Sequence, residues 1–190
     1  MEFKHIILVN SDALQQVAFD VTVNMERMLN RRIPDMDIRK WLYAAACDGC
    51  VPPGEAVKAV FVGNGDIPGN IEKSGIQIGK QFEFQGFEFV VENAETAVNA
   101  SHTFVERMEE LLACETLEKI VCVPGESLEQ YTARILSQKP RIGTTVLSVE
   151  QLRGAGFSWQ FLSCSVCYAA GVTDEEIRNM DSSPHHHCCC

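Results

Sequence analysis

Positive charge is scarce in this sequence, which holds 16 Lys and Arg against 26 Asp and Glu for a formal net charge of -10. A protein that holds nucleic acid through bulk electrostatics needs clustered Lys and Arg, so this balance disfavours RNA as a partner. Long apolar runs are missing too, and the one in MEFKHIILVN is too short for a secretory signal or a membrane span. We therefore expect a cytoplasmic protein with no membrane partner.

Several common catalytic signatures are also absent. The glycine-rich stretch GNGDIPGN, residues 63–70, lacks the Gly-Lys-Ser/Thr ending of a phosphate loop. Ser127 does not occupy a Gly-x-Ser-x-Gly elbow, and His102, the only mid-chain histidine, falls on a predicted helix beside Ser101. These absences leave no support for a nucleotide phosphate loop or for a serine hydrolase.

Cysteine, by contrast, is abundant, with nine in the chain. In a reducing compartment, free or metal-bound thiols are expected rather than disulfides. Two Cys-x-x-Cys pairs, Cys47 with Cys50 and Cys164 with Cys167, could supply the four thiolates of a structural Zn²⁺ site if they meet. The second pair could equally fill the core side of an apolar helix. The ending HHHCCC, residues 185–190, could scavenge soft metal ions, and we expect residues 181–190 to form a flexible tail.

Apolar runs of strand length alternate with helical periodicity along the chain. Four or five strands are predicted, at Ile6–Val9, Ala56–Asn64, Phe87–Asn93, Lys119–Ser127 and Gly143–Val149. Helices are predicted over residues 13–29, 38–47, 100–114, 128–136 and 159–170, with a short last helix opened by a capping box at Thr173–Glu176. Residues 67–85 fit a strand or a helix equally. The pattern predicts one α/β domain over residues 1–180, a three-layer sandwich with a mostly parallel central sheet and C-terminal helices.

The carboxyl ends of parallel strands gather at one edge of a sheet, where α/β proteins bind ligands. We expect a cleft there, lined by the polar residues Asn10, Ser11, Asp12, Asn64, Asp66 and Glu126. Carboxylates in such a place could hold Mg²⁺ or Mn²⁺ and activate water, and the candidates for that catalytic role are Asp12, Asp66, Glu92 and Glu126. The simpler alternative is that Asn, Asp and Gly serve there as turn and cap residues, with Asp12 capping the first helix.

Three stretches within residues 5–150 resemble motifs of the NYN domains, a group of PIN-like, metal-dependent ribonucleases. VNSDAL (residues 9–14), AVNAS (97–101) and VCVPGESLEQY (121–131) are similar to stretches in which that family carries catalytic aspartates. At those positions this chain has Asn10, Asn99 and Leu128, so the resemblance implies that Asn99 is a seventh residue of the cleft. An amide oxygen is neutral and cannot neutralise a divalent ion, so the resemblance implies a site that has lost catalysis.

Three hypotheses about function follow. The first is a catalytically inactive, NYN-like domain that binds a ligand or a protein partner at the sheet edge. The second is a divalent-metal ribonuclease with a rearranged acidic site. The third is a structural or interaction protein stabilised by Zn²⁺ at the cysteine pairs.

Overall fold

The computed structural model describes residues 3–69, 71–95 and 99–181, and the predicted tail at 182–190 lies outside these residues. The strands are β1 (His5–Asn10), β2 (Ala56–Gly63), β3 (Gln81–Phe84), β4 (Phe87–Glu95), β5 (Lys119–Val123), β6 (Gly143–Ser148) and β7 (Ser158–Phe161). The helices are α1 (Ser11–Leu29), α2 (Ile38–Asp48), α3 (Ile71–Ser74), α4 (Ala100–Leu112), the 3-10 turn η1 (Glu126–Leu128), α5 (Glu129–Ser137), α6 (Leu162–Ala169) and α7 (Asp174–Asp181).

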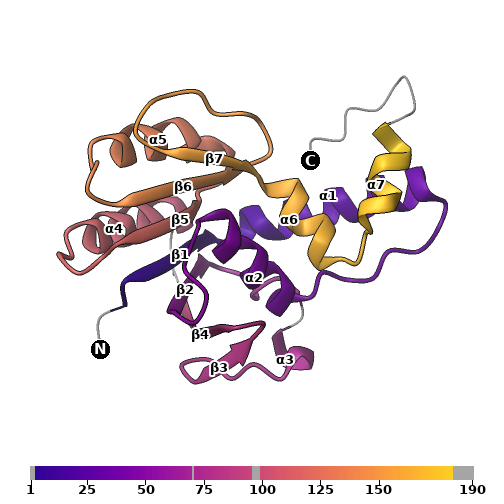
Figure 1. Cartoon of the computed structure of the whole chain (residues 1–190), viewed down its shortest axis with the longest axis horizontal. Coiled ribbons are helices and arrows are strands. Elements are labelled where there is room, and N and C mark those ends of the chain that lie inside the picture. The colour runs from indigo at the N-terminus through magenta and orange to yellow at the C-terminus, as the bar shows by residue number, and fades with distance from the viewer. Residues whose placement is uncertain (1–2, 70, 96–98, 182–190) are drawn as a thin grey trace.

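All of these strands belong to one sheet in the order β3-β4-β2-β1-β5-β6-β7 (Figure 1). Every neighbouring pair is parallel except β3 with β4, which form an antiparallel hairpin at one edge. Its turn residues Gln85 and Gly86 both have positive φ, which matches the right-handed twist of the two strands. The mostly parallel α/β sheet predicted from the sequence is thus confirmed, with more strands than expected.

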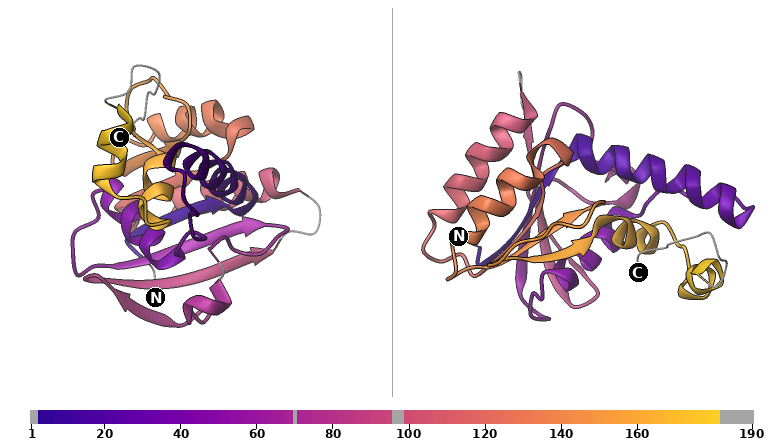
Figure 2. Two further views of the ribbon diagram at one scale, coloured as in Figure 1. Left: turned by 90° about the vertical axis from the view of Figure 1, so that its right-hand side faces the viewer. Right: turned by 90° about the horizontal axis from the view of Figure 1, so that it is seen from above.

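Helices cover both faces of the sheet, because the central strands are apolar on both sides. Ile7 and Val9 of β1 pack into one core with α1, α2 and α6. Ile6 and Leu8 face the other core, under α4 and α5. Figure 2 shows α4 and α5 on one side of the sheet and α1, α2 and α6 on the other. This is the predicted three-layer arrangement.

The predicted N-cap of the first helix is wrong by two residues. Asp12 lies inside α1, and the cap is Asn10, whose side-chain oxygen accepts a hydrogen bond from the Ala13 amide. Both residues are good caps, and the choice depends on where β1 ends. The predicted capping box of α7 is confirmed, because Thr173 Oγ1 accepts from the Glu176 amide and Glu176 accepts from the Thr173 amide.

Residues 158–161 form the strand β7, whereas the sequence predicts a helix that begins at residue 159. β7 pairs with β6 from Thr145–Ser158 to Ser148–Phe161, and Trp159 Nε1 donates to Ser148 Oγ at 2.6 Å. Pairing with a distant strand supplies backbone partners that local periodicity cannot reveal. The undecided segment 67–85 contains the short helix α3 and the edge strand β3.

Candidate functional site

The carboxyl ends of β1, β2 and β5 meet the N-terminal ends of α1, α4 and η1 around a hollow of about 770 Å³, which we call the cleft. Five of the seven residues predicted to line it do so. The complete lining is Asn10, Asp12, Ala13, Asn64, Asn99, Ala100, Ser101, Gly125, Glu126 and Ser127. The two serines Ser101 and Ser127 were not predicted. Their signal was available, since each lies within two residues of a predicted cleft residue.

Ser11 is not a cleft residue, because it is the first residue of α1 and only 1% exposed. Its side chain is in the contact between α1 and β2. A Cβ added to Gly63 would lie 2.9 Å from the Ser11 Cβ, so the end of β2 must be glycine for α1 to approach this closely. Ser11 is therefore a packing residue, which corrects its predicted place in the cleft.

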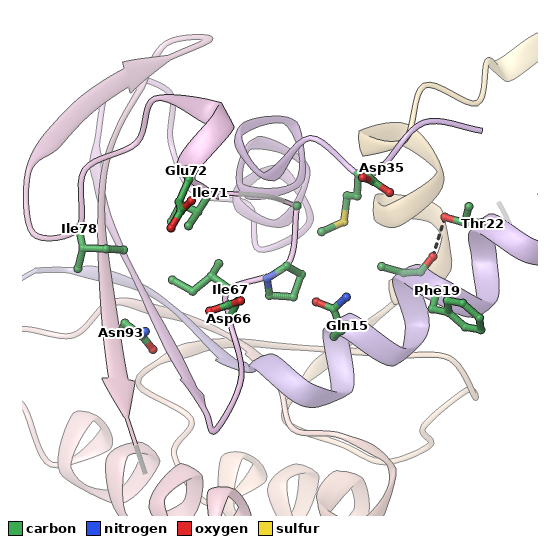
Figure 3. A pocket seen from close by; sticks show the side chains of 14 residues that line it. Gln15, Phe19, Thr22, Asp35, Asp66, Ile67, Ile71, Glu72, Ile78 and Asn93 are labelled. Carbon is green, nitrogen blue, oxygen red and sulfur yellow. Dashed lines mark hydrogen bonds between the residues drawn. The ribbon is translucent and has the colours of Figure 1, made fainter. Parts of the chain in front are cut away.

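Asp66 lies in a second hollow, on the α1 side of the loop that follows β2. We call this hollow of about 480 Å³ the acidic cavity, and Figure 3 shows it. It is lined by Gln15, Ala18, Phe19, Thr22, Asp35, Met36, Asp66, Ile67, Pro68, Gly69, Ile71, Glu72, Ile78 and Asn93. Asp66 and Asn93 lie near the ends of two predicted strands, and no pattern in the sequence connects the remaining segments to them.

The side-chain amide of Asn10 makes hydrogen bonds at both of its ends. Its Oδ1 accepts from the Ala13 amide at 3.2 Å, and its Nδ2 donates to the carbonyl oxygen of Pro124 at 3.2 Å. The residue is 9% exposed. Asn10 therefore caps α1 and also joins the end of β1 to the chain after β5. An aspartate could perform the first task but could not donate to Pro124.

Asn99 is the N-cap of α4. Its Oδ1 accepts from the backbone amides of Ser101 at 3.0 Å and His102 at 3.3 Å. The amide oxygens of Asn10 and Asn99 are thus both held by helix N–H groups. An oxygen in that position is turned toward its own helix rather than toward an ion in the cleft, and an exposed cap of this kind needs no ligand to explain it.

The four carboxylates proposed for a metal-dependent mechanism are separated. Asp12 and Glu126 line the cleft, whereas Asp66 lines the acidic cavity. Glu92 is paired with Arg107 of α4 at 2.6 Å and with Lys58 at 3.4 Å. Within residues 3–69, 71–95 and 99–181, no three His, Cys, Asp or Glu side chains are grouped so that they could hold a metal ion. The predicted Mg²⁺ or Mn²⁺ cage is therefore not assembled.

The cysteine pairs come near each other without forming a four-thiolate site. Cys47 at the end of α2 and Cys164 of α6 line one hollow together with Tyr43 and Tyr168. Cys50 is exposed beyond the end of α2, and Cys167 is 2% exposed in the core. Cys164 is disulfide-bonded, which corrects the expectation of thiols rather than disulfides for this residue and removes it as a thiolate ligand. The prediction of one Zn²⁺ held by Cys47, Cys50, Cys164 and Cys167 is therefore wrong, since Cys50 is also in solvent and Cys167 in the packed interior.

Desolvation marks one further carboxylate outside the cleft. Asp48, the last residue of α2, lines the same hollow as Cys47, and burial raises its pKa to about 6. Near the cleft, burial, Glu126 and Glu150 raise the pKa of Glu129. These shifts report partial burial of negative charge.

A family model that matches residues 2–177 assigns the chain to DUF6621, a family of unknown function. The chain belongs to this family. No curated protein and no solved structure matches it. In the part of the chain that the structure describes, none of the helices is long and apolar enough to cross a membrane.

Proposed function

We propose that this member of a family of unknown function binds a polar ligand in the cleft at the carboxyl edge of its sheet and does not cleave it. The observation that carries the proposal is the engagement of Asn10 and Asn99 as helix caps. Their oxygens are neutral and already accept hydrogen bonds from α1 and α4. The cleft therefore has a rigid frame that is not a metal cage.

The groups that remain for a ligand are of mixed character. Asp12 and Glu126 offer exposed carboxylates, and Ser101 and Ser127 offer hydroxyl groups. The N-terminal ends of α1 and α4 contribute the partial positive charge of unpaired backbone N–H groups. A ligand rich in hydroxyl and amino groups, such as a nucleoside or a sugar, fits this combination of donors and acceptors better than a bare ion does.

The proposal includes a relationship to NYN and PIN-like domains. In this view the cleft corresponds to the active site of those domains, with side-chain amides in place of catalytic carboxylates. The support is that the three resembling stretches contribute Asn10, Asn99 and Glu126 to one hollow.

We also propose a cytoplasmic location. Its support is the free thiols of Cys47, Cys50 and Cys114, which a reducing compartment preserves, whereas the disulfide bond of Cys164 is a feature against it. Fractionation of the producing cells tests that location.

The absence of catalysis is tested with a labelled single-stranded RNA incubated with the purified protein and Mg²⁺ or Mn²⁺. We expect no metal-dependent cleavage above the buffer control. The Glu126→Gln variant serves as the matched control for contaminating nuclease, because a contaminant is unaffected by it. Cleavage by the wild-type protein that disappears in Glu126→Gln would return the ribonuclease hypothesis and reject the proposal.

Ligand binding is tested by thermal unfolding with a panel of nucleosides, nucleotides and sugars. A true ligand raises the melting temperature of the wild-type protein, because it binds only the folded state. Ser127→Trp, which places a large side chain at the exposed rim of the cleft, should remove that rise. Ser158→Trp on the far edge strand is the control and should keep it. A rise that survives Ser127→Trp would place the ligand elsewhere.

A further inference from the structure

The acidic cavity is formed by four segments that are distant in the sequence. α1 supplies one wall, and the residues before α2, the loop after β2 with α3, and the sheet side at Asn93 supply the others. Figure 3 shows the side chains of Asp35, Asp66 and Glu72 on different sides of this hollow. Its volume of about 480 Å³ is within the range of small-molecule sites.

Its walls are largely apolar. Met36 and Ile67 are almost fully buried behind it, while Phe19 is 63% and Ile78 49% exposed beside it. Exposed apolar side chains of this size are few in the described residues; Phe19 and Ile78 both line this cavity, and Phe19 also lines a neighbouring hollow with Val23 and Val149. An aliphatic ligand that covered them would remove apolar surface from water, which favours binding.

The charges of the cavity are all negative and are not compensated by the fold. The lining contains three carboxylates, Asp35, Asp66 and Glu72, and no Lys, Arg or His. Among the described residues, none of the three takes part in a salt bridge within 4.0 Å. Asn93 Oδ1 is buried and finds no hydrogen-bond donor among those residues. The cavity therefore has acceptors available for a cation with N–H groups.

A single metal ion does not suit this arrangement, because the carboxylates are not grouped around one point. Separated negative charges joined by apolar walls match a ligand whose positive charges are separated by methylene chains. A second copy of this chain is disfavoured by its net charge of -10. From the cavity, its apolar walls and this charge complementarity, we propose that the acidic cavity binds a linear aliphatic polyamine. Its ammonium groups pair with Asp35, Asp66 and Glu72 and its methylene segments lie against Phe19, Ile67 and Ile78.

Isothermal titration calorimetry of the full chain with spermidine tests this proposal. We expect saturable binding near one equivalent that weakens as salt is raised, because exposed carboxylates are screened. Mg²⁺ at equal ionic strength and 1,6-hexanediol, which has the chain without the charge, should give no saturable binding. Equal binding of Mg²⁺ would show an unspecific ion atmosphere and overturn the proposal.

The double variant Asp66→Asn with Glu72→Gln assigns the site. Both side chains are exposed, so the fold should be unaffected and spermidine should bind about tenfold more weakly or not at all. Glu83→Gln, an exposed carboxylate on β3, is the matched control and should retain wild-type affinity. Unchanged affinity in the double variant would reject the site. A lysine-rich octapeptide that binds far more tightly than spermidine, and is lost in the double variant, would replace the polyamine with a peptide.

Ser127→Trp separates this inference from the proposed function, since it changes the cleft and leaves the acidic cavity intact. Spermidine binding should be the same in Ser127→Trp and in the wild-type protein. If Ser127→Trp abolishes spermidine binding, the polyamine belongs to the cleft and the inference is wrong.

Discussion

The cleft and the acidic cavity share the loop after β2, which contributes Asn64 to the first and Asp66 to the second, yet their polar groups differ in state. In the cleft, the two central asparagines hold helix ends and a neighbouring carbonyl group. In the acidic cavity, the carboxylates have no ion-pair partner among the described residues. Polar residues that the sequence predicts to bind a ligand can instead stabilise the fold, as the cleft asparagines do. Polar groups without a partner in the fold, such as the carboxylates of the acidic cavity, are better candidates for ligand binding.

The strongest test of this contrast is Asn10→Ala. It removes the α1 cap and the hydrogen bond to the Pro124 carbonyl, so the free energy of unfolding should fall by about 2 kcal/mol. Urea denaturation measures it. Asn10→Asp keeps the cap acceptor and loses only the donor, so its cost should be smaller at low pH than at neutral pH. A change under about 0.5 kcal/mol for Asn10→Ala would contradict the structural role assigned to Asn10 and leave its side chain free for a ligand.

Asn99→Ala should have the next effect. The cap of α4 is exposed, so its loss should lower the free energy of unfolding by about 1 kcal/mol. Asn99→Asp keeps the oxygen acceptor at the helix N-terminus and should be nearly neutral in the same urea titration. If Asn99→Asp instead confers tight Mn²⁺ binding, a single carboxylate is enough to make the cleft a metal site. The polar groups of the cleft would then be available to a ligand, as those of the acidic cavity are.

Asp48→Asn tests a carboxylate that is partly buried and lies outside both the cleft and the acidic cavity. Burial raises the pKa of Asp48 to about 6, so the folded state holds its proton more tightly than the unfolded state does. This contribution is fully present below about pH 4 and is lost as the pH rises through 6. Asp48→Asn should therefore stabilise the protein at pH 7 by about 1 kcal/mol, allowing for partial exposure, and have little effect at pH 4. Thermal unfolding at the two pH values measures the difference, and equal effects would contradict it.

The smallest effect is expected for Asp66→Asn with Glu72→Gln in the absence of ligand. Neither carboxylate makes an ion pair with a described residue, so the free energy of unfolding should change by less than about 0.5 kcal/mol. A loss of more than about 1 kcal/mol would show that these side chains support the fold. The acidic cavity would then resemble the cleft, and the contrast would fail.

Much of the fold was predictable because its signals are local. The apolar runs of β1, β2, β4, β5 and β6 and the helical periodicity between them imply a parallel sheet with covered faces. The convergence of Asn10 and Asn64 followed from that topology, since parallel strands end at one edge, whereas Asn99 was expected there only from the resemblance to NYN domains. The capping box at Thr173 needed only four residues of sequence.

What the sequence could not supply depends on distant contacts. β7 exists because Trp159 and its neighbours pair with β6, and the acidic cavity exists because α1 and the segment with α3 enclose one hollow. The pattern contained one hint that was not used: Phe19 and Val23 lie four residues apart on α1 and off its buried face, where both line a further hollow with Val149. Apolar residues at that spacing outside the core stripe indicate a second apolar surface.

The place of β1 in the sheet has a consequence for synthesis of the chain. The first strand made is the central one, and β2, β4 and β3 complete one side of it before β5 is available for the other. Until then, the apolar run Ile6–Val9 has an open backbone edge that can recruit another nascent chain. A truncation after β4 should therefore aggregate, and full-length protein should be recovered best when translation is slow enough for each later strand to cover that edge in turn.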